Sequence, residues 1–362
     1  YPIDIGGMYV TDDTTNPSQY QIPSDFPEVT TIPPKGHLII WADNDSLDGP
    51  LHTNFKISAS GEQVALFNTD GISLIDYINF PSQDTNISYQ RFPDGADNWQ
   101  YCLNPTPAQS NIEGVAGFTP EPIYSKEGGL VKDPFTLNLS NPSTEAEIYY
   151  TIDGCEPNYN SILYTGPIEL DQTAHIRAIS YQPGLEPSHI VSNSYLFMEP
   201  DMQDFSSDLP IVVIDTHGFY IDGENSPSVQ YPYRNIETIY IEPNSTGRAS
   251  VNDQPSFVGR GGMRVRGQTS AGFGKKQWRY EVWDEYNHDK NVSLLGMPKE
   301  DDWIIHGPYS DKTLMRNYLA YKWSNDIGPY AVRCKFFELF YNDDGNDVSY
   351  EEDYWGVYIL ME

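Results

Sequence analysis

Hydrophobic and polar positions alternate with a period of two in several short runs of the chain, which is the pattern of strands with one buried face. In the first third, the alternation predicts strands at Met8 to Thr11, His37 to Ala42, Gln63 to Phe67 and Ile72 to Phe80. Turn signals such as Asp70-Gly71 separate these runs. Long stretches lack the apolar period of a helix, so the fold should be mainly β.

The alternation restarts in the middle of the chain, at Ile148 to Gly154, Leu163 to Ile168 and His175 to Ser180. After these runs, the small polar and acidic residues of 199–209 predict a linker. The strands before the linker therefore belong to a second group, separate from the first.

A length of 362 residues exceeds that of a usual single domain. Together with the two groups of strands, it predicts three domains. Residues 1–112 and 119–198 should form two separate β-sandwiches, and residues 210–362 should form a mixed α+β part.

The last segment contains the clearest helical pattern. Ser310 is a candidate N-cap, and Gly328-Pro329 is a stop signal. Between them, apolar residues follow helical spacing at Leu314, Tyr318, Leu319, Trp323 and Ile327. No acidic residue lies between Asp311 and Asp326, so the polar face of this predicted helix carries Arg316 and Asn317 instead.

Charge is unevenly distributed. The formal net charge of −31 disfavours nucleic acid and anionic membranes as partners. Yet the stretch from Arg248 to Tyr280 holds seven basic residues against the single acid Asp253. Such a basic island suits a compact anion such as phosphate.

A hairpin with a glycine-rich loop lies within the basic island. Period-two geometry places Arg264 and Arg266 on one strand face and Met263 with Val265 on the other. The loop 267–274 contains three glycines and two hydroxyl residues, and Lys275-Lys276 follow it directly. Glycines let backbone N–H groups face a phosphate, and a nearby lysine adds a point charge. An ordinary hairpin with solvated lysines is the alternative.

The three cysteines, Cys102, Cys155 and Cys334, fall in three different predicted domains, so all should be free thiols. Cys155 is interpreted as a small buried side chain. No run is long and apolar enough for a membrane-spanning helix.

Residues 1–112 resemble the lamin-tail domain, an immunoglobulin-like fold of secreted bacterial proteins. The motifs that carry the resemblance are Asp4 to Tyr9, Leu38 to Asp43, His52 to Ser58, Arg91 to Gly95 and Pro105 to Pro107. The resemblance implies that an earlier strand of this family precedes Tyr1.

Residues 119–198 are similar to the small fibronectin-like module at the C-terminus of chitobiases and hexosaminidases, through the three strand runs of that segment. That module carries no catalytic residues. The resemblance implies a spacer or a weak glycan-associated role.

Residues 210–362 resemble the CotH family of atypical protein kinases. The motifs occur in family order: Arg264 to Gly267, Thr269-Ser270, Lys275-Lys276, Val292 to Pro298, Asp302 to Ile304, Ser310 to Asn317 and Tyr354 to Glu362. The resemblance implies a reduced protein-kinase-like fold that uses ATP with Mg²⁺ or Mn²⁺ to phosphorylate Ser or Thr on proteins.

Carried over to this chain, the resemblance makes Lys276, or Lys275 beside it, the lysine that contacts the α and β phosphates. The implied nucleotide-binding residues are Arg264, Arg266, Gly267, Thr269, Ser270, Gly272, Gly274, Arg316, Met361 and Glu362. For Arg316, a structural ion pair is an equal alternative. Because the predicted helix lacks a Glu, the carboxylate partner of the lysine is sought among Glu281, Asp311 and Glu338, unless the resemblance to ordinary kinases ends there.

The metal-binding and catalytic aspartates of the CotH family lie beyond the position of Glu362. The metal ligands of such a kinase are therefore unknown in this chain, and residues 1–362 alone are expected to be inactive. The resemblances together imply a secreted or cell-surface bacterial protein whose partners are extracellular proteins or glycans. The competing function is a non-enzymatic adhesion or scaffold protein with a pseudokinase-like module.

Two acidic clusters raise the question of Ca²⁺. These are Asp43, Asp45 and Asp48 before Gly49, and Asp343, Asp344 and Asp347 around Gly345. Neither has the spacing of an EF-hand loop. The second is interpreted as a solvated hairpin turn, with Ca²⁺ binding as the alternative.

Overall fold

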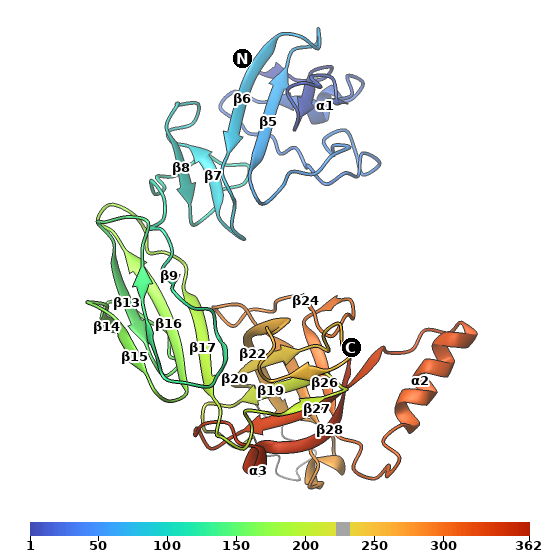
Figure 1. Cartoon of the computed structure of the whole chain (residues 1–362). Helices are drawn as coiled ribbons and strands as arrows, with labels where there is room; N and C mark the ends of the chain where they lie inside the picture. The colour runs from blue at the N-terminus through green and yellow to red at the C-terminus, as the bar shows by residue number, and fades with distance from the viewer. Residues whose placement is uncertain (222–231) are drawn as a thin grey trace. The chain divides into compact units, whose positions relative to one another are not determined.

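The computed structural model describes residues 1–221 and 232–362 and is mainly β, as the alternation predicts (Figure 1). Helical segments within these residues are short: α1 (Pro27–Thr30), α2 (Arg316–Ile327), α3 (Tyr350–Asp353) and the 3-10 turn η1 (Ser270–Gly272). The chain divides into two compact units. The first comprises Tyr1–Phe118 with Gly184–Glu186, and the second comprises the other described residues.

The first unit contains a four-stranded antiparallel sheet in the order β3-β2-β5-β6. Its strands are β2 (Tyr9–Thr11), β3 (Tyr20–Gln21), β5 (Glu62–Phe67) and β6 (Leu74–Phe80). Two further pairs join β1 (Ile3–Asp4) to β4 (Thr31–Ile32) and β7 (Ser88–Arg91) to β8 (Trp99–Cys102). The small core is centred on Val10, Ile22 and Phe55.

The predicted strand at His37 to Ala42 is wrong. The segment forms no ladder, and Trp41 makes only an isolated parallel bridge with His52. Its apolar residues Leu38 and Ile40 still pack against the core of the first unit. The alternation thus predicted correctly that Leu38 and Ile40 face the core. Among the described residues, no strand lies beside this segment to form a β-ladder with it.

The second unit begins with an all-β module that spans β9 to β17. Its main sheet has the order β10-β17-β16-β13-β14, formed by β10 (Gly129–Val131), β13 (Glu147–Thr151), β14 (Ile162–Leu163), β16 (Ala174–Tyr181) and β17 (Val191–Phe197). Two strand pairs complete it: β9 (Ile123–Tyr124) with β12 (Leu139–Ser140), and β11 (Phe135–Leu137) with β15 (Ile168–Leu170). We call this the β9–β17 module.

A closed seven-stranded barrel forms the rest of the second unit, in the order β19-β20-β22-β23-β26-β28-β27 (Figure 1). Its strands are β19 (Ile211–Asp215), β20 (Arg234–Ile241), β22 (Phe257–Val265), β23 (Trp278–Val282), β26 (Asp302–His306), β27 (Cys334–Asn342) and β28 (Tyr354–Met361). The parallel pair β19 and β27 closes it. A short pair, β24 (Val292–Ser293) and β25 (Lys299–Glu300), precedes β26.

Both faces of the barrel wall are apolar in places. On β19, Val212 and Ile214 pack in the interior, whereas Ile211 and Val213 belong to a second core outside it. That outer core also contains Leu196 and Met198 from the end of the β9–β17 module. The module and the barrel therefore share buried apolar surface, which favours a fixed arrangement of the two.

Residues 199–209, predicted as a linker, are packed against the barrel. Met202 is fully buried in the shared outer core. Ser206–Ser207 forms β18, which pairs with β21 (Ala249–Ser250). The polar composition suggested a linker, but the two apolar residues Met202 and Phe205 pack in this outer core and anchor the segment.

Helix α2 begins later than predicted, at Arg316 rather than just after Ser310. Asp311 is the cause, because its carboxylate accepts hydrogen bonds from the backbone N–H groups of Thr313 and Arg316 at 3.1 and 2.8 Å. These bonds hold residues 311–315 in a turn. None of the residues of α2 is buried, although Tyr318 lies 4.9 Å from the Phe336 ring.

The turn around Gly345 is exposed at Asp344, Gly345 and Asn346, but its second half packs against the β9–β17 module. Asp347 accepts hydrogen bonds from the backbone N–H and the hydroxyl of Thr173 in the β9–β17 module, both at 3.0 Å. Val348 is fully buried in the shared outer core. The interpretation as a solvated turn is therefore wrong at its second half.

Candidate functional site

The predicted hairpin exists, with β22 and β23 antiparallel and Arg264 paired with Arg279 across it. Met263 and Val265 are buried in the barrel interior, whereas Arg264 is partly exposed and its guanidinium lies 4.4 Å from the centre of the Tyr233 ring. Arg266 is exposed. The two arginines thus lie on the face opposite the core, as the period of two predicts.

The loop 267–274 folds tightly around η1. Gly267 has a φ of +101°, and a Cβ there would lie 2.0 Å from the Ser270 hydroxyl oxygen, so the position requires glycine. Thr269, Gly272 and Gly274 are exposed. The loop therefore presents its glycines and one hydroxyl to solvent, next to the two lysines.

Lys276 is buried, with 8% of its surface exposed, and its ammonium group donates to the Ala271 carbonyl at 3.0 Å. It shares strand parity with Trp278 and Tyr280, whose side chains are in the barrel interior. The alternative of a solvated lysine is therefore wrong for Lys276. Side chains alternate between the two faces of an extended segment, so Lys276 points to the same side as Trp278 and Tyr280, toward the barrel interior.

Lys275 is half-buried at the same place. Its ammonium group lies 4.3 Å from the centre of the Tyr358 ring and 3.5 Å from the Trp355 carbonyl oxygen. Burial lowers its pKa, and the negative charge of Glu338 opposes this shift. Gly307 packs on both lysines, since a Cβ there would lie 2.4 Å from the Lys276 carbonyl oxygen.

Of the three carboxylates considered as partners of the lysine, Glu338 is the one whose charge acts on Lys275. Its oxygens accept from the hydroxyls of Ser207 and Tyr354 at 2.8 and 2.7 Å. Glu281 lies 3.7 Å from Arg279, and Asp311 lies 3.6 Å from Arg316. Of these three, Glu338 is therefore the carboxylate in the electrostatic environment of Lys275.

The remaining predicted ligand residues lie at the helix and at the end of β28. Arg316 has a side chain that is 75% exposed, and its contact with Asp311 fits the structural alternative. Met361 is buried. Glu362 binds Arg333 at 3.0 Å and accepts from the Tyr330 hydroxyl at 2.6 Å.

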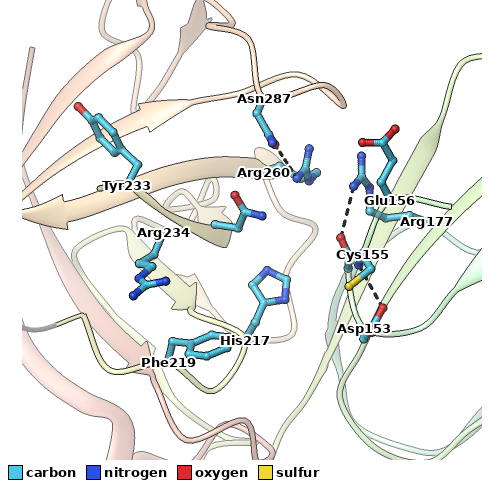
Figure 2. Close-up of a pocket in the computed structure, with 12 residues that line it drawn as sticks. Asp153, Cys155, Glu156, Arg177, His217, Phe219, Tyr233, Arg234, Arg260 and Asn287 are labelled. Atoms are coloured by element: carbon cyan, nitrogen blue, oxygen red, sulfur yellow. Dashed lines mark hydrogen bonds between the residues drawn. The ribbon is translucent and has the colours of Figure 1, made fainter. Parts of the chain in front are cut away.

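A pocket of about 390 Å³ lies between the β9–β17 module and the barrel (Figure 2). It is lined by Asp153, Gly154, Cys155, Glu156, Arg177, His217, Phe219, Tyr233, Arg234, Asn235, Arg260 and Asn287. Neither Lys275 nor Lys276 lines it. Arg177 from the module is nearly buried, and its guanidinium donates to the carbonyls of Gly154 and Glu285.

Three ligand-type side chains meet beside this pocket, and the sequence analysis did not foresee them. His175 comes from β16, while Asp215 ends β19 and His217 follows it. The ligand atoms of the three lie within 4.8 Å of one another. Burial and the charge of His175 lower the pKa of His217 to about 3, so its imidazole is neutral. The run Asp215-Thr216-His217 at the end of the apolar strand β19 was the sequence feature that could have indicated this group.

In the described ranges 1–221 and 232–362, no other group of three or more His, Cys, Asp or Glu side chains brings its ligand atoms this close together. The acidic clusters at Asp43 and Asp343 do not bring three ligand atoms together in this way. Asp43 is instead bonded to the His52 ring at 2.6 Å.

The three cysteines are free, as predicted. Cys155, however, is exposed and lines the pocket, so its interpretation as a buried side chain is wrong. A hydrogen bond to Asp153 raises the pKa of the Cys155 thiol.

Two family models match the chain. Residues 263–362 match the CotH kinase protein family, and residues 137–195 match the family described as Fn3 associated. The first match includes the loop 267–274, both lysines, α2 and β28, so this part of the barrel is CotH-like. Neither match extends over residues 1–112. Among curated proteins, no sequence matches this chain.

Across the described part of the chain, no helix has the length and apolar character required to cross a membrane.

Proposed function

We propose that the barrel is the nucleotide-binding part of a CotH-type protein kinase, which uses ATP and Mg²⁺ or Mn²⁺ to phosphorylate Ser or Thr on proteins. The observation that carries the proposal is the joint occurrence of the CotH match and two desolvated lysines beside a glycine-rich loop. Phosphoryl transfer depends mainly on positioned charge, which such lysines supply.

Lys276 is the favoured phosphate ligand in this proposal. Its ammonium group is held against the loop by the Ala271 carbonyl, so a small loop movement would exchange that carbonyl for a phosphate oxygen. Lys275 adds a second positive charge next to the Tyr358 ring. Glu338 would then balance the charge of Lys275, as a helix glutamate does in ordinary kinases.

The loop residues would cover the phosphates through backbone N–H groups, with Thr269 and Ser270 adding hydroxyl donors. Arg264, Arg266 and Arg316 would supply outer positive charge. Met361 and Glu362 would begin the segment that holds the adenine.

We further infer that residues 1–112 are a lamin-tail-type immunoglobulin-like module and that the β9–β17 module is a fibronectin-like spacer. Both would present the kinase part outside the cell, on a secreted or surface-attached bacterial protein. Extracellular proteins, or glycans, would be its partners.

The test is replacement of each lysine by methionine in the full-length natural protein. Methionine keeps most of the apolar stem, which matters because Lys276 is buried. Labelling of a protein substrate by ATP should fall about 100-fold or more in Lys276→Met, as for the loss of one donor in other charge-stabilised sites. Lys335→Met is the matched control, because Lys335 is exposed on β27.

Circular dichroism and the melting temperature establish whether each variant folds. If folded Lys275→Met and Lys276→Met variants label substrate and bind ATP as the control does, the phosphate site is refuted. The scaffold function, with a pseudokinase-like barrel, then becomes the better account. The rigid packing of the β9–β17 module on the barrel would suit that role.

A further inference from the structure

The group His175, Asp215 and His217 lies where the β9–β17 module meets the barrel, away from the proposed phosphate site. On β16, Ile176 and Ala178 pack in the core of the module. His175 therefore points to the opposite face of the strand, toward the barrel. Asp215 and His217 come from the barrel itself.

The hydrogen bonds of the group leave one acceptor unused. The Oδ1 atom of Asp215 lies 3.1 Å from His175 Nε2 and accepts from the His217 backbone N–H at 2.9 Å. The Oδ2 atom is buried and has no hydrogen-bond partner, and the side chain is 1% exposed. A buried carboxylate oxygen without a hydrogen-bond partner lowers the stability of the folded state. A bound cation would supply the missing partner of Oδ2.

Both histidines are placed to act as ligands. Their ring centres are 4.0 Å apart. The Nδ1 atom of His175 lies 3.0 Å from the Ser194 hydroxyl, a contact that fixes the ring and leaves Nε2 directed at Asp215. Metal-bound histidines commonly have such a second contact through their other nitrogen.

The geometry points to one divalent transition-metal ion: we propose that His175, Asp215 and His217 bind an ion of the zinc class, which joins the β9–β17 module to the barrel. Two imidazole nitrogens and one carboxylate oxygen are a ligand set of zinc-type sites with an open position. Ca²⁺ and Mg²⁺ prefer oxygen ligands alone.

Access and charge are compatible with this ion. All three residues line a pocket of about 470 Å³, so the ion has an entry path and room for a water ligand. In a tetrahedral zinc site the ligand atoms are about 3.3 Å apart. The present spread of 4.8 Å therefore requires a ring movement of His217, which is only partly buried. The positive charges of the nearby Arg177 and Arg260 are offset by carboxylates, since their guanidinium groups lie 3.7 and 3.8 Å from Glu285 and Glu237.

The test uses the tag-free chain, stripped with a chelator and titrated with Zn²⁺ or Co²⁺. One equivalent of Zn²⁺ should bind, measured by calorimetry and elemental analysis. Co²⁺ should give a visible absorption band from the bound ion. The melting temperature of the second unit should rise with the metal, because only the folded state brings the three ligands together.

Two variants and a control make the test specific. Asparagine tolerates the φ of +56° at position 217, so His217→Asn should fold. It should lower the affinity for Zn²⁺ by more than about 100-fold, which exceeds the loss expected for an outer-shell partner. Ser194→Ala removes the contact to His175 Nδ1 and should lower affinity about 10- to 100-fold. His288→Asn, an exposed histidine beside Asp284, should bind as the unchanged chain does.

The proposal is overturned if the unchanged chain binds no metal by these readouts, which would leave a hydrogen-bonded cluster alone. It is equally overturned if His217→Asn and His288→Asn bind alike. These results are independent of ATP labelling, so failure here leaves the proposed kinase function untouched.

Discussion

Met202 offers a direct test of whether the module and the barrel are rigidly joined. It lies in the segment 199–209, which the sequence predicts as a linker, yet it is fully buried in the core shared by Leu196, Ile211 and Val348. Because of this packing, Met202→Ala should destabilise both sides of this core. If the segment were a linker, the substitution should have almost no effect.

The expected magnitude follows from the burial. Truncation of a fully buried methionine to alanine costs about 2–5 kcal/mol, through lost transfer free energy and the cavity left behind. The backbone hydrogen bonds of Met202 to Glu199 and Phe205 are unaffected by the change. A loss of about 3 kcal/mol corresponds to roughly a 100-fold increase in the opening equilibrium of the affected strands.

Hydrogen exchange followed by mass spectrometry measures this locally. Peptides from β17 and β19 should lose protection in Met202→Ala, whereas β5 in the first unit serves as an internal reference. Met315→Ala is the matched control, because Met315 is 48% exposed. If exchange from β17 and β19 in the two variants differs by less than about threefold, equivalent to under 1 kcal/mol, the shared core is not a stabilising contact.

Two further predictions concern titrating groups. Burial raises the pKa of Asp353 to about 7 from 3.8, so the stability that this carboxyl contributes is complete below about pH 4 and is lost as pH rises through 7. In Asp353→Asn, the denaturant midpoint of the second unit should fall less steeply with rising pH. If the midpoint depends on pH as it does in the unchanged chain, the raised pKa of Asp353 is contradicted. Asp153→Asn should speed the reaction of the exposed Cys155 with a thiol reagent near pH 8, since the hydrogen bond that raises the thiol pKa is removed. Equal rates in the two chains would show that Asp153 does not control this thiol, with buried Cys102 as the slow reference.

Several features could be predicted from local sequence. The runs at Gln63 to Phe67 and Ile72 to Phe80 match β5 and β6, which pair antiparallel. The faces of β22 follow the period of two, with Met263 and Val265 inside. These predictions hold because the direction of a strand side chain depends on backbone geometry alone.

The candidate site was only partly accessible in this way. The sequence marks Lys275 and Lys276 by their position after a glycine-rich loop, but their burial depends on closure of the barrel around Trp278 and Tyr358. The group His175, Asp215 and His217 was missed because His175 is distant in sequence from the other two. Only the packing of the module on the barrel brings them together.

The sequence by itself determined that this protein is mainly β, that its three thiols remain unpaired, and that its positive charge gathers between Arg248 and Tyr280. Tertiary structure decided that β19 and β27 close a barrel, that Met202 is buried, and that Cys155 is exposed. The physical reason is that a period of two reports which face of a strand is apolar. It does not report which distant segment covers that face, because that choice depends on long-range packing.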